Sequence, residues 1–374
     1  MIINSKFFGH LLCINTPGIC QKGKNLLYLQ KLFSMTAKRT KRASIKDIAR
    51  EAGVSPTLVS FVLNGKQKQY RVSDQVADKI REVVKRMDYK PNGFAKSLRE
   101  GTSHTIGVIV SDIANPFFAN IVKNIETVAE ERGYMALFAS SDENAERLSN
   151  LLGKMLCKEV EGVIVVPCEG SEDTIRSLVD KRIPTVLLDR YIPDVRTNYV
   201  SLDNRKAGYD ATEELIRKGH KKISLICYDF KLSNMKGRIE GYREAMKDYG
   251  LADEIKIQYV NISTLEKNGA KAIDKALSDG CKAIVCATNS ITVMCLRHLQ
   301  KLKKNVPEDV TVMGFDGGSE FDFYNAPISF MTQPSETIAK KSVDILINQL
   351  QSNEGFITQI EIEGSILEHT PPTY

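Results

Sequence analysis

The first clear pattern of apolar and polar positions lies in residues 44–64, where apolar side chains recur every three or four residues. This spacing places them on one face of an α-helix. Two such faces follow each other, one formed by Ile45, Ile48, Ala49 and Ala52, and the other by Leu58, Val59 and Val62. The pattern therefore predicts two short helices that pack together through their apolar faces.

The residues that flank these faces are typical of helix ends. Ser44 and Ser55 are preferred N-cap residues, and Pro56 suits the first turn of the second helix, where its missing N–H has no partner. Gly53 tolerates the left-handed backbone that ends many helices. This arrangement is typical of a helix-turn-helix, whose second helix can enter the major groove of DNA. Two helices that only pack together remain the alternative.

A third helix is predicted from Ser73, as its N-cap, to about Asp88. It follows a polar loop that carries Lys66, Lys68 and Arg71. Its apolar stripe comprises Val76, Ile80, Val83, Val84 and Met87. The three helices would form a head of about 45 residues. Residues 93–100 then form a segment too short to be a stable helix alone, and we expect a linker there.

From Thr105 onward, short apolar runs alternate with helical stretches. The runs are TIGVIVSD, YMALFASS, GVIVVP, PTVLLD, KISLICYD, AIVCAT and VTVMGFD. The helical stretches begin near Phe117, Asn144, Glu172, Asn204, Lys236, Leu265 and Ser290. This alternation predicts parallel sheets covered by helices on both faces, and its length favours two α/β lobes. Ligands bind beyond the carboxyl ends of such strands, where the polar residues are Ser111, Asp112, Asp189, Arg190, Asp229, Asn289 and Asp316.

The charge of the chain is divided unevenly. Residues 1–104 contain 20 Lys and Arg against 7 Asp and Glu, whereas the rest contains 32 against 39. A basic head on an acidic body is expected of a nucleic-acid-binding module joined to a different domain. The asymmetry therefore favours DNA binding over simple helix packing in the head.

The eight cysteines form no CxxC pair and the five histidines are scattered, so we expect neither a metal cluster nor a cofactor. Several cysteines lie in apolar runs, which favours buried thiols in a reducing cytoplasm, with disulfides as the alternative. No apolar run reaches the roughly 18 residues of a transmembrane helix. For residues 1–42 we expect a disordered extension, with Met35 as a natural start and a signal peptide as the alternative.

Several segments resemble the lac repressor (LacI/GalR) family of bacterial transcriptional regulators, in order and in spacing. They are SIKDIAREAGVSPTLVSFVLNG, KPNGFAKSLREGTSHTIGVIVSDIANPFF, GVIVVP, LLDR, DNRKAG, RKGHKKI, GRIEGYREAM and VMGFDG. The resemblance extends from about Ala43 to the C-terminus. The head motif is highly specific when it is combined with NPFF and GFDG, whereas each of these alone is common.

The resemblance implies a small all-α helix-turn-helix head and an α/β two-lobed core of the periplasmic-binding-protein type. The implied parts are a head at 43–90, a hinge helix at 91–104, and an effector-binding and dimerisation core at 105–374. The first lobe would comprise about 105–201 and 334–350, and the second about 202–327. The chain would cross between lobes near 200–203, 325–328 and 332–334.

The resemblance also implies residues that bind a pseudo-palindromic DNA operator. They are Ser44, Ser55, Pro56, Thr57, Ser60, Phe61, Asn64, Asn92 and Leu98. Leu98 matches the leucine that wedges between central base pairs, with packing on the head as the alternative. Phe61 departs from the arginine of the best-known member, which puts guanine recognition in doubt and leaves thymine methyl contact or packing within the head.

For the core, the resemblance implies that Phe117, Asp189, Arg238, Asn289 and Asp316 hold a small-molecule effector. Carboxylates, a guanidinium and an amide suit sugar hydroxyls, which both donate and accept hydrogen bonds. Each residue also has a structural alternative, such as a salt bridge for Asp189 or Arg238, a strand-end cap for Asp316 and core packing for Phe117. Ser290 follows Asn289 where the family commonly has Asp, which leaves a non-sugar ligand open.

We therefore expect a cytoplasmic, nucleoid-associated homodimeric repressor whose operator binding is controlled by a sugar-like effector. One alternative is a secreted sugar-binding receptor, because the core fold is shared. The other is an enzyme on an α/β core, but the chain has no GxGxxG, GxxxxGK[ST], GxSxG or HExxH motif.

Overall fold

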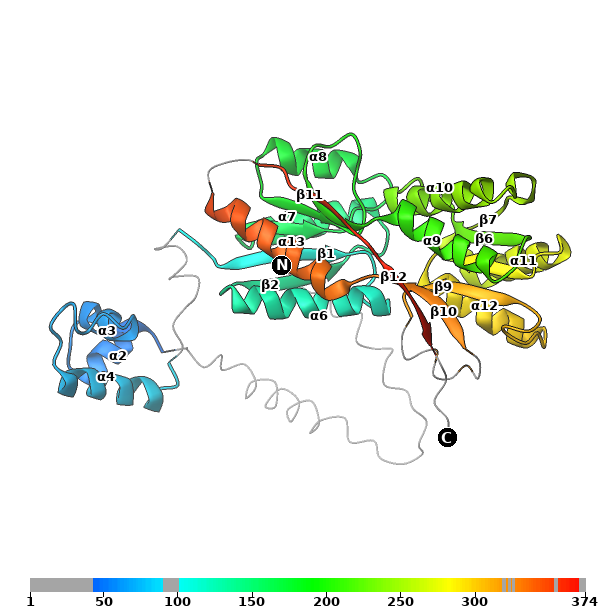
Figure 1. Ribbon diagram of the computed structural model, residues 1–374. Coiled ribbons are helices and arrows are strands. Elements are labelled where there is room, and N and C mark those ends of the chain that lie inside the picture. The colour runs from blue at the N-terminus through cyan, green and yellow to red at the C-terminus, as the bar shows by residue number, and fades with distance from the viewer. Residues whose placement is uncertain are drawn as a thin grey trace, which may run out of the picture. The chain divides into compact units, whose positions relative to one another are not determined.

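The computed structural model describes residues 43–89, 101–317, 321, 324, 327–352 and 356–369 (Figure 1). The chain divides into two units, residues 1–96 and residues 97–374, which we call the head and the core. The extension expected at 1–42 and most of the hinge expected at 91–104 lie outside the described residues.

The head contains three helices, α2 (Ile45–Ala52), α3 (Pro56–Leu63) and α4 (Asp74–Arg86). Their apolar stripes meet in one cluster, in which Ile48, Val59 and Ile80 are fully buried. Burial of these side chains stabilises the packing of three helices that are too short to be stable alone.

Local hydrogen bonds explain where the head helices begin and end. The Ser44 hydroxyl accepts from the Asp47 amide while Asp47 bonds back to Ser44, which forms a capping box at α2. Gly53 ends α2 with φ of 69°, and the Ser55 Oγ accepts from the Leu58 amide at 3.2 Å to cap α3. Ser73 precedes α4, but the expected side-chain cap is wrong because its hydroxyl makes no such bond.

The core contains two six-stranded sheets (Figure 1). The first has the order β11-β5-β4-β3-β1-β2 and is parallel throughout. The second has the order β12-β10-β9-β8-β6-β7 and is parallel except for β12. The first sheet comprises β1 (Thr105–Val110), β2 (Met135–Ser140), β3 (Gly162–Val165), β4 (Thr185–Leu188), β5 (Asn198–Leu202) and β11 (Gln359–Ile362). The second comprises β6 (Ile223–Tyr228), β7 (Lys256–Val260), β8 (Ala283–Cys286), β9 (Thr311–Phe315), β10 (Ile328–Thr332) and β12 (Ser365–His369).

Helices cover both faces of each sheet. The helices of the first lobe are α6 (Pro116–Glu131), α7 (Ala145–Leu156), α8 (Glu172–Asp180) and α13 (Ser335–Gln351). Those of the second are α9 (Asn204–Arg217), α10 (Ser233–Asp248), α11 (Leu265–Ser278) and α12 (Asn289–Lys301), with short 3-10 turns at Ala252–Glu254 and Ile262–Thr264. In β1, Ile106 and Val108 face one hydrophobic cluster and Ile109 faces another, so this strand is buried on both sides.

The chain passes between the lobes after β5, after β10, and between β11 and β12. The crossing expected near 325–328 is therefore wrong, because β10, which begins at Ile328, lies beside β9 in the second sheet. The third crossing instead includes Gly364, where an added Cβ would lie 2.8 Å from the Met331 sulfur and the Thr332 oxygen. The sequence did not predict β10, because ISFMT contains only three apolar residues and lies between two expected crossings.

Candidate functional site

A cleft of about 820 Å³, including the space open to solvent, lies at the carboxyl ends of strands from both lobes. It is lined by all five residues that the sequence nominated, namely Phe117, Asp189, Arg238, Asn289 and Asp316. Sequence reasoning did not nominate Glu143, Asn234 or Gln333 among its lining residues. Glu143 lies in a turn and Asn234 in the first turn of α10, whereas Gln333 directly follows β10, a strand that the sequence did not predict.

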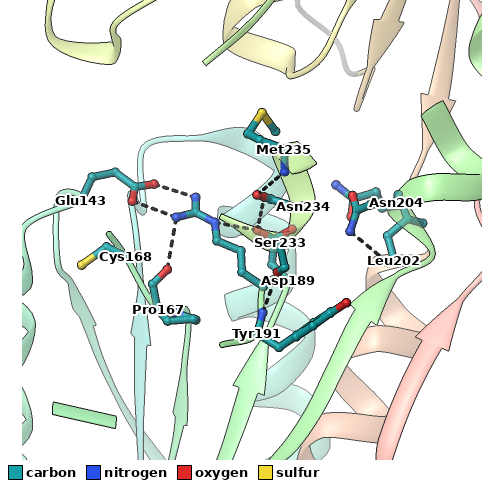
Figure 2. A network of polar contacts seen from close by, with 12 residues as sticks. Glu143, Pro167, Cys168, Asp189, Tyr191, Leu202, Asn204, Ser233, Asn234 and Met235 are labelled. Atoms are coloured by element: carbon teal, nitrogen blue, oxygen red, sulfur yellow. Dashed lines mark hydrogen bonds and ion pairs between the residues drawn. The ribbon is translucent and has the colours of Figure 1, made fainter. Parts of the chain in front are cut away.

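The first lobe contributes a buried ion network to the cleft (Figure 2). The Arg190 guanidinium donates to both oxygens of Glu143 at 2.8 and 2.6 Å, and to Asp189 Oδ2 at 3.1 Å. It also donates to the Pro167 carbonyl at 3.2 Å. Burial lowers the pKa of Arg190, but its two carboxylate partners outweigh this and raise it above the ordinary value. Arg190 therefore stays charged, and its guanidinium N–H groups are already hydrogen-bonded to partners within the first lobe.

Asp189 follows β4 in the left-handed region, with φ of 67°, and its side chain is nearly fully buried. Burial raises the pKa of this carboxyl, although Arg190 and Arg238 oppose the shift. The salt-bridge alternative is thus observed for Asp189, which lines the cleft and pairs with Arg190 at the same time.

Two hydrogen bonds join the lobes at the first turn of α10 (Figure 2). The Asn234 amide donates to Asp189 Oδ2 at 3.1 Å, and the Tyr191 backbone N–H donates to Ser233 Oγ at 2.9 Å. Both bonds depend on the distance between the first turn of α10 and the end of β4. Any ligand that changes this distance must make or break them.

The second lobe contributes Arg238, which is 2% exposed. Its Nε donates to Asn204 Oδ1 at 2.9 Å, its Nη1 donates to the Ala287 carbonyl, and its guanidinium carbon lies 4.1 Å from the centre of the Phe315 ring. Burial lowers the pKa of Arg238, while Asp316 and Asp189 oppose that shift. The neutral partners fix the orientation of the guanidinium at the floor of the cleft.

Asp316 follows β9 with φ of 56° and is half-buried. Its Oδ2 accepts from Gln333 Nε2 at 2.9 Å, and its backbone carbonyl accepts from the Asn289 side-chain amide. Burial raises the pKa of Asp316 to about 6, although Arg238 and Gln333 oppose the shift. This carboxyl therefore changes its charge close to neutral pH.

Phe117 lies in the first turn of α6 and is 9% exposed. Its ring packs edge-on against Phe118 with 4.9 Å between ring centres, and both belong to the core of the first lobe. Core packing, which was the alternative for Phe117, is therefore observed, although the residue also lines the cleft.

On the head, Pro56 and Thr57 are exposed in the first turn of α3, as a base-reading position requires. Phe61 is half-buried and stacks on Tyr70, so the packing alternative holds for at least one of its faces. Asn64 donates to the Ser60 carbonyl at 2.7 Å, and the Ser44 hydroxyl donates to Asp47. Asn92 and Leu98 lie outside the described residues.

Cysteine, histidine and acidic side chains also occur outside the cleft in the described residues. Within this part of the chain, no group of His, Cys, Asp and Glu side chains is arranged to hold a metal ion. None of its helices combines the length and apolar character needed to cross a membrane. Among the described cysteines, Cys157 is exposed and the buried thiols are Cys168, Cys227, Cys281, Cys286 and Cys295.

Comparison with known proteins agrees with this geometry. Residues 44–92 match the family model of bacterial regulatory proteins of the lacI family, and residues 103–370 match that of periplasmic binding proteins and the sugar-binding domain of the LacI family. The ribose operon repressor of Escherichia coli (strain K12) is 30% identical, over 88% of this chain and 97% of that protein. The transcriptional repressor PurR of Vibrio vulnificus (strain CMCP6) is 28% identical, over 83% of this chain and 93% of that protein.

Solved structures of LacI-type regulators are similar to this chain in fold. A lac repressor dimer bound to operator and an anti-inducer has a TM-score of 0.77 and 21% identity, over 87% of this chain and 98% of that one, which supports the fold. A complex of the transcriptional regulator CelR with cellobiose has a TM-score of 0.63 and 25% identity, with the same coverage. The match of the head separates this chain from a secreted receptor, and the family consists of regulators and not enzymes. The chain therefore belongs to the LacI family of bacterial regulatory proteins.

Proposed function

We propose that this LacI-family regulator represses transcription as a homodimer, and that an uncharged sugar held by Asp189, Arg238, Asn289 and Asp316 controls its binding to a pseudo-palindromic operator. The observation that carries the proposal is the convergence of these four residues from both lobes on one cleft. A ligand that touches both lobes changes their relative position, which is the change that a head joined to the first lobe can respond to.

The charges of the cleft favour a neutral ligand. Among the described residues that line it, four carry carboxylates, namely Asp112, Glu143, Asp189 and Asp316, and two carry guanidinium groups, namely Arg190 and Arg238. Arg190 is already occupied by two carboxylates and a carbonyl, and Arg238 interacts with Asp316 and Asp189. A phosphate or carboxylate ligand would add negative charge to this surplus, whereas sugar hydroxyls can donate to the carboxylates.

Two of the related proteins are named for neutral sugars, ribose and cellobiose. These names indicate the chemical class to test first for this chain. Phe117, Tyr228 and Phe230 line the same cleft and supply apolar surface for the face of a sugar ring. Thermal unfolding of the full chain with neutral sugars, phosphosugars and sugar acids tests the class. Stabilisation by a phosphosugar alone would overturn it.

For the operator, we assign base contacts to Pro56, Thr57 and Phe61, and phosphate contacts to Ser44, Ser55, Ser60 and Asn64. Asn92 and Leu98 would act in the hinge, with Leu98 wedged between central base pairs. The protein would act in the cytoplasm, on the nucleoid. Leu98→Ala should weaken binding to a selected operator far more than binding to an unrelated duplex. An equal loss for both duplexes would contradict the wedge.

The test of the whole function is operator binding measured with and without sugar. Duplexes selected by the purified full-length chain from a random pool should share an inverted repeat. A sugar that stabilises the chain should then change its affinity for that repeat by about 5–150-fold. If no duplex is enriched at moderate salt, with or without sugars, the proposed function is wrong.

A further inference from the structure

An aromatic stack lies against the second helix of the helix-turn-helix. The rings of Phe61 in α3 and Tyr70 in the following loop are parallel, with 0° between their planes and 3.7 Å between their centres. Tyr70 is nevertheless 48% exposed. The stack is therefore at the surface of the head and is not part of its buried cluster.

The position of Phe61 places the stack on the face that meets DNA. Phe61 follows Thr57 by four residues and precedes Asn64 by three, so the three side chains share one side of α3. Thr57 and Asn64 are both exposed there. A ring that covers Phe61 therefore borders the surface that the base-reading residues form.

Backbone hydrogen bonds hold the loop in place beside α3. The Lys66 N–H donates to the Phe61 carbonyl at 2.9 Å, and the Tyr70 N–H donates to the Lys66 carbonyl at 3.1 Å. The Val72 N–H closes the loop on the Gln67 carbonyl at 2.9 Å. These bonds connect the backbone of Tyr70 to that of Phe61 through Lys66. The Tyr70 ring is therefore held beside Phe61 by an ordered loop.

The charge of the loop fits a duplex. Lys66, Lys68 and Arg71 are exposed, and residues 64–73 contain no Asp or Glu. Exposed cations on both sides of Tyr70 attract phosphates, which would bring the loop against the backbone next to the groove that α3 enters.

We propose that Tyr70 is a specificity-determining residue that positions Phe61 for base reading by stacking on its ring. With one face of Phe61 covered, the ring is held in a single orientation and presents its other face and its edge to the groove. An apolar surface of this kind can contact the methyl group of thymine. This inference rests on the proposed role of α3 in operator binding.

The test compares specific and unspecific binding of full-length variants. After an operator has been selected with the wild type, its affinity and that of a scrambled duplex are measured for Tyr70→Ala, Tyr70→Phe, Phe61→Ala and the double alanine variant. Gln69→Ala, an exposed change in the same loop, is the matched control. Circular dichroism and thermal unfolding report whether each head remains folded.

We expect Tyr70→Ala to lower operator affinity about ten-fold, a loss of about 1.4 kcal/mol, and to relax the preference at the base pair that Phe61→Ala also relaxes. The scrambled duplex should be bound as before. Tyr70→Phe keeps the ring and should retain the preference, and the double variant should lose little beyond the larger single loss.

Three results would overturn the proposal: equal loss for both duplexes, additive losses in the double variant, or Tyr70→Phe behaving like Tyr70→Ala. If Tyr70→Ala does not fold, the comparison of Tyr70→Phe with Tyr70→Leu decides, because leucine covers Phe61 without a parallel ring. Unchanged preference in Tyr70→Leu then contradicts the stack. If the wild type itself selects no operator, the proposed function fails and not this inference alone.

Discussion

The two lobes place an aspartate at the same point of the same architecture. Asp189 follows β4 and Asp316 follows β9, and these strands hold equivalent places in the two sheet orders. Both residues have a positive φ, and each N–H donates to the neighbouring strand, to Val200 at 3.0 Å and to Met331 at 2.9 Å. The same backbone conformation therefore places one carboxylate from each lobe in the cleft.

The surroundings of the two carboxylates differ. Asp189 is sealed by Arg190 and by Asn234, so its charge is compensated before any ligand arrives. Asp316 is half-buried and accepts its side-chain bond from the neutral Gln333, and its pKa is raised to about 6 because of burial. The first lobe thus presents a preformed half of the site, whereas the second presents a carboxyl that can still change its charge and its partners.

Removal of the cation from the ion network of the first lobe should have the largest effect, which is a loss of stability. Arg190→Met leaves Glu143 and Asp189 as buried carboxylates without their cation, and removal of one partner of a buried ion pair costs about 3–5 kcal/mol. Urea unfolding of the full chain measures this loss. Arg205→Met removes the exposed pair with Glu244 and should cost far less, because water and salt screen an exposed ion pair. If both variants lose a similar free energy of unfolding, the buried ion network of Arg190 contributes no more than an exposed ion pair.

Arg238→Ala tests the second lobe. It removes the cation that faces both aspartates, and we expect sugar binding to weaken about 30-fold or more, a loss of about 2 kcal/mol, while the dimer stays folded. Isothermal titration measures the affinity, and light scattering measures the dimer. Arg243→Ala, an exposed change in the same helix, should leave both unchanged. An unaltered sugar response in Arg238→Ala would remove this residue from the site.

Titration of Asp316, in the second lobe, should have a smaller effect, which is seen in the pH dependence of stability and of sugar affinity. Its folded pKa of about 6 lies above the ordinary value of 3.8, so the native state holds the proton more tightly and stability falls as pH rises from about 4 to 6. Sugar affinity should rise over the upper part of this range, because the carboxylate accepts hydroxyl protons. Binding measured from pH 5 to 7.5 should lose this rise in Asp316→Asn and keep it in Asp112→Asn.

The smallest expected effect concerns the bond that joins the lobes. Ser233→Ala removes the acceptor of the Tyr191 N–H and should change sugar affinity by less than about ten-fold, since one neutral hydrogen bond contributes about 1 kcal/mol. Small-angle scattering should detect a wider opening of the core without sugar. If both affinity and opening stay as in the wild type, the first turn of α10 does not control the distance between the lobes.

Much of this site follows from rules that act locally in the sequence. Ser44, Gly53 and Ser55 set the helix ends of the head through caps, and Asp189 and Asp316 are prominent because polar residues at strand ends face the cleft of a parallel sheet. The helix starts of the core were predicted for the same reason, since buried strands and helices alternate with clear periods.

What escaped prediction depends on contacts between distant segments. Glu143 binds Arg190 from a turn 47 residues earlier, and Gln333 at the end of β10 binds Asp316 at the end of the neighbouring strand β9. The ring of Tyr70 meets Phe61 only because of the bonds that fold the loop between them. The sequence did not predict the strand β10, because its five residues are too few to show a period that distinguishes a strand from a connection.

The most direct test of the central claim, that cleft and operator share one equilibrium, is a reciprocal titration. Operator affinity is measured at zero and saturating sugar, and sugar affinity is measured at zero and saturating operator, both on the full-length chain. The two affinities should change by the same factor, because a coupling free energy acts equally in both directions. A sugar that binds the cleft while leaving operator affinity unchanged would contradict the claim.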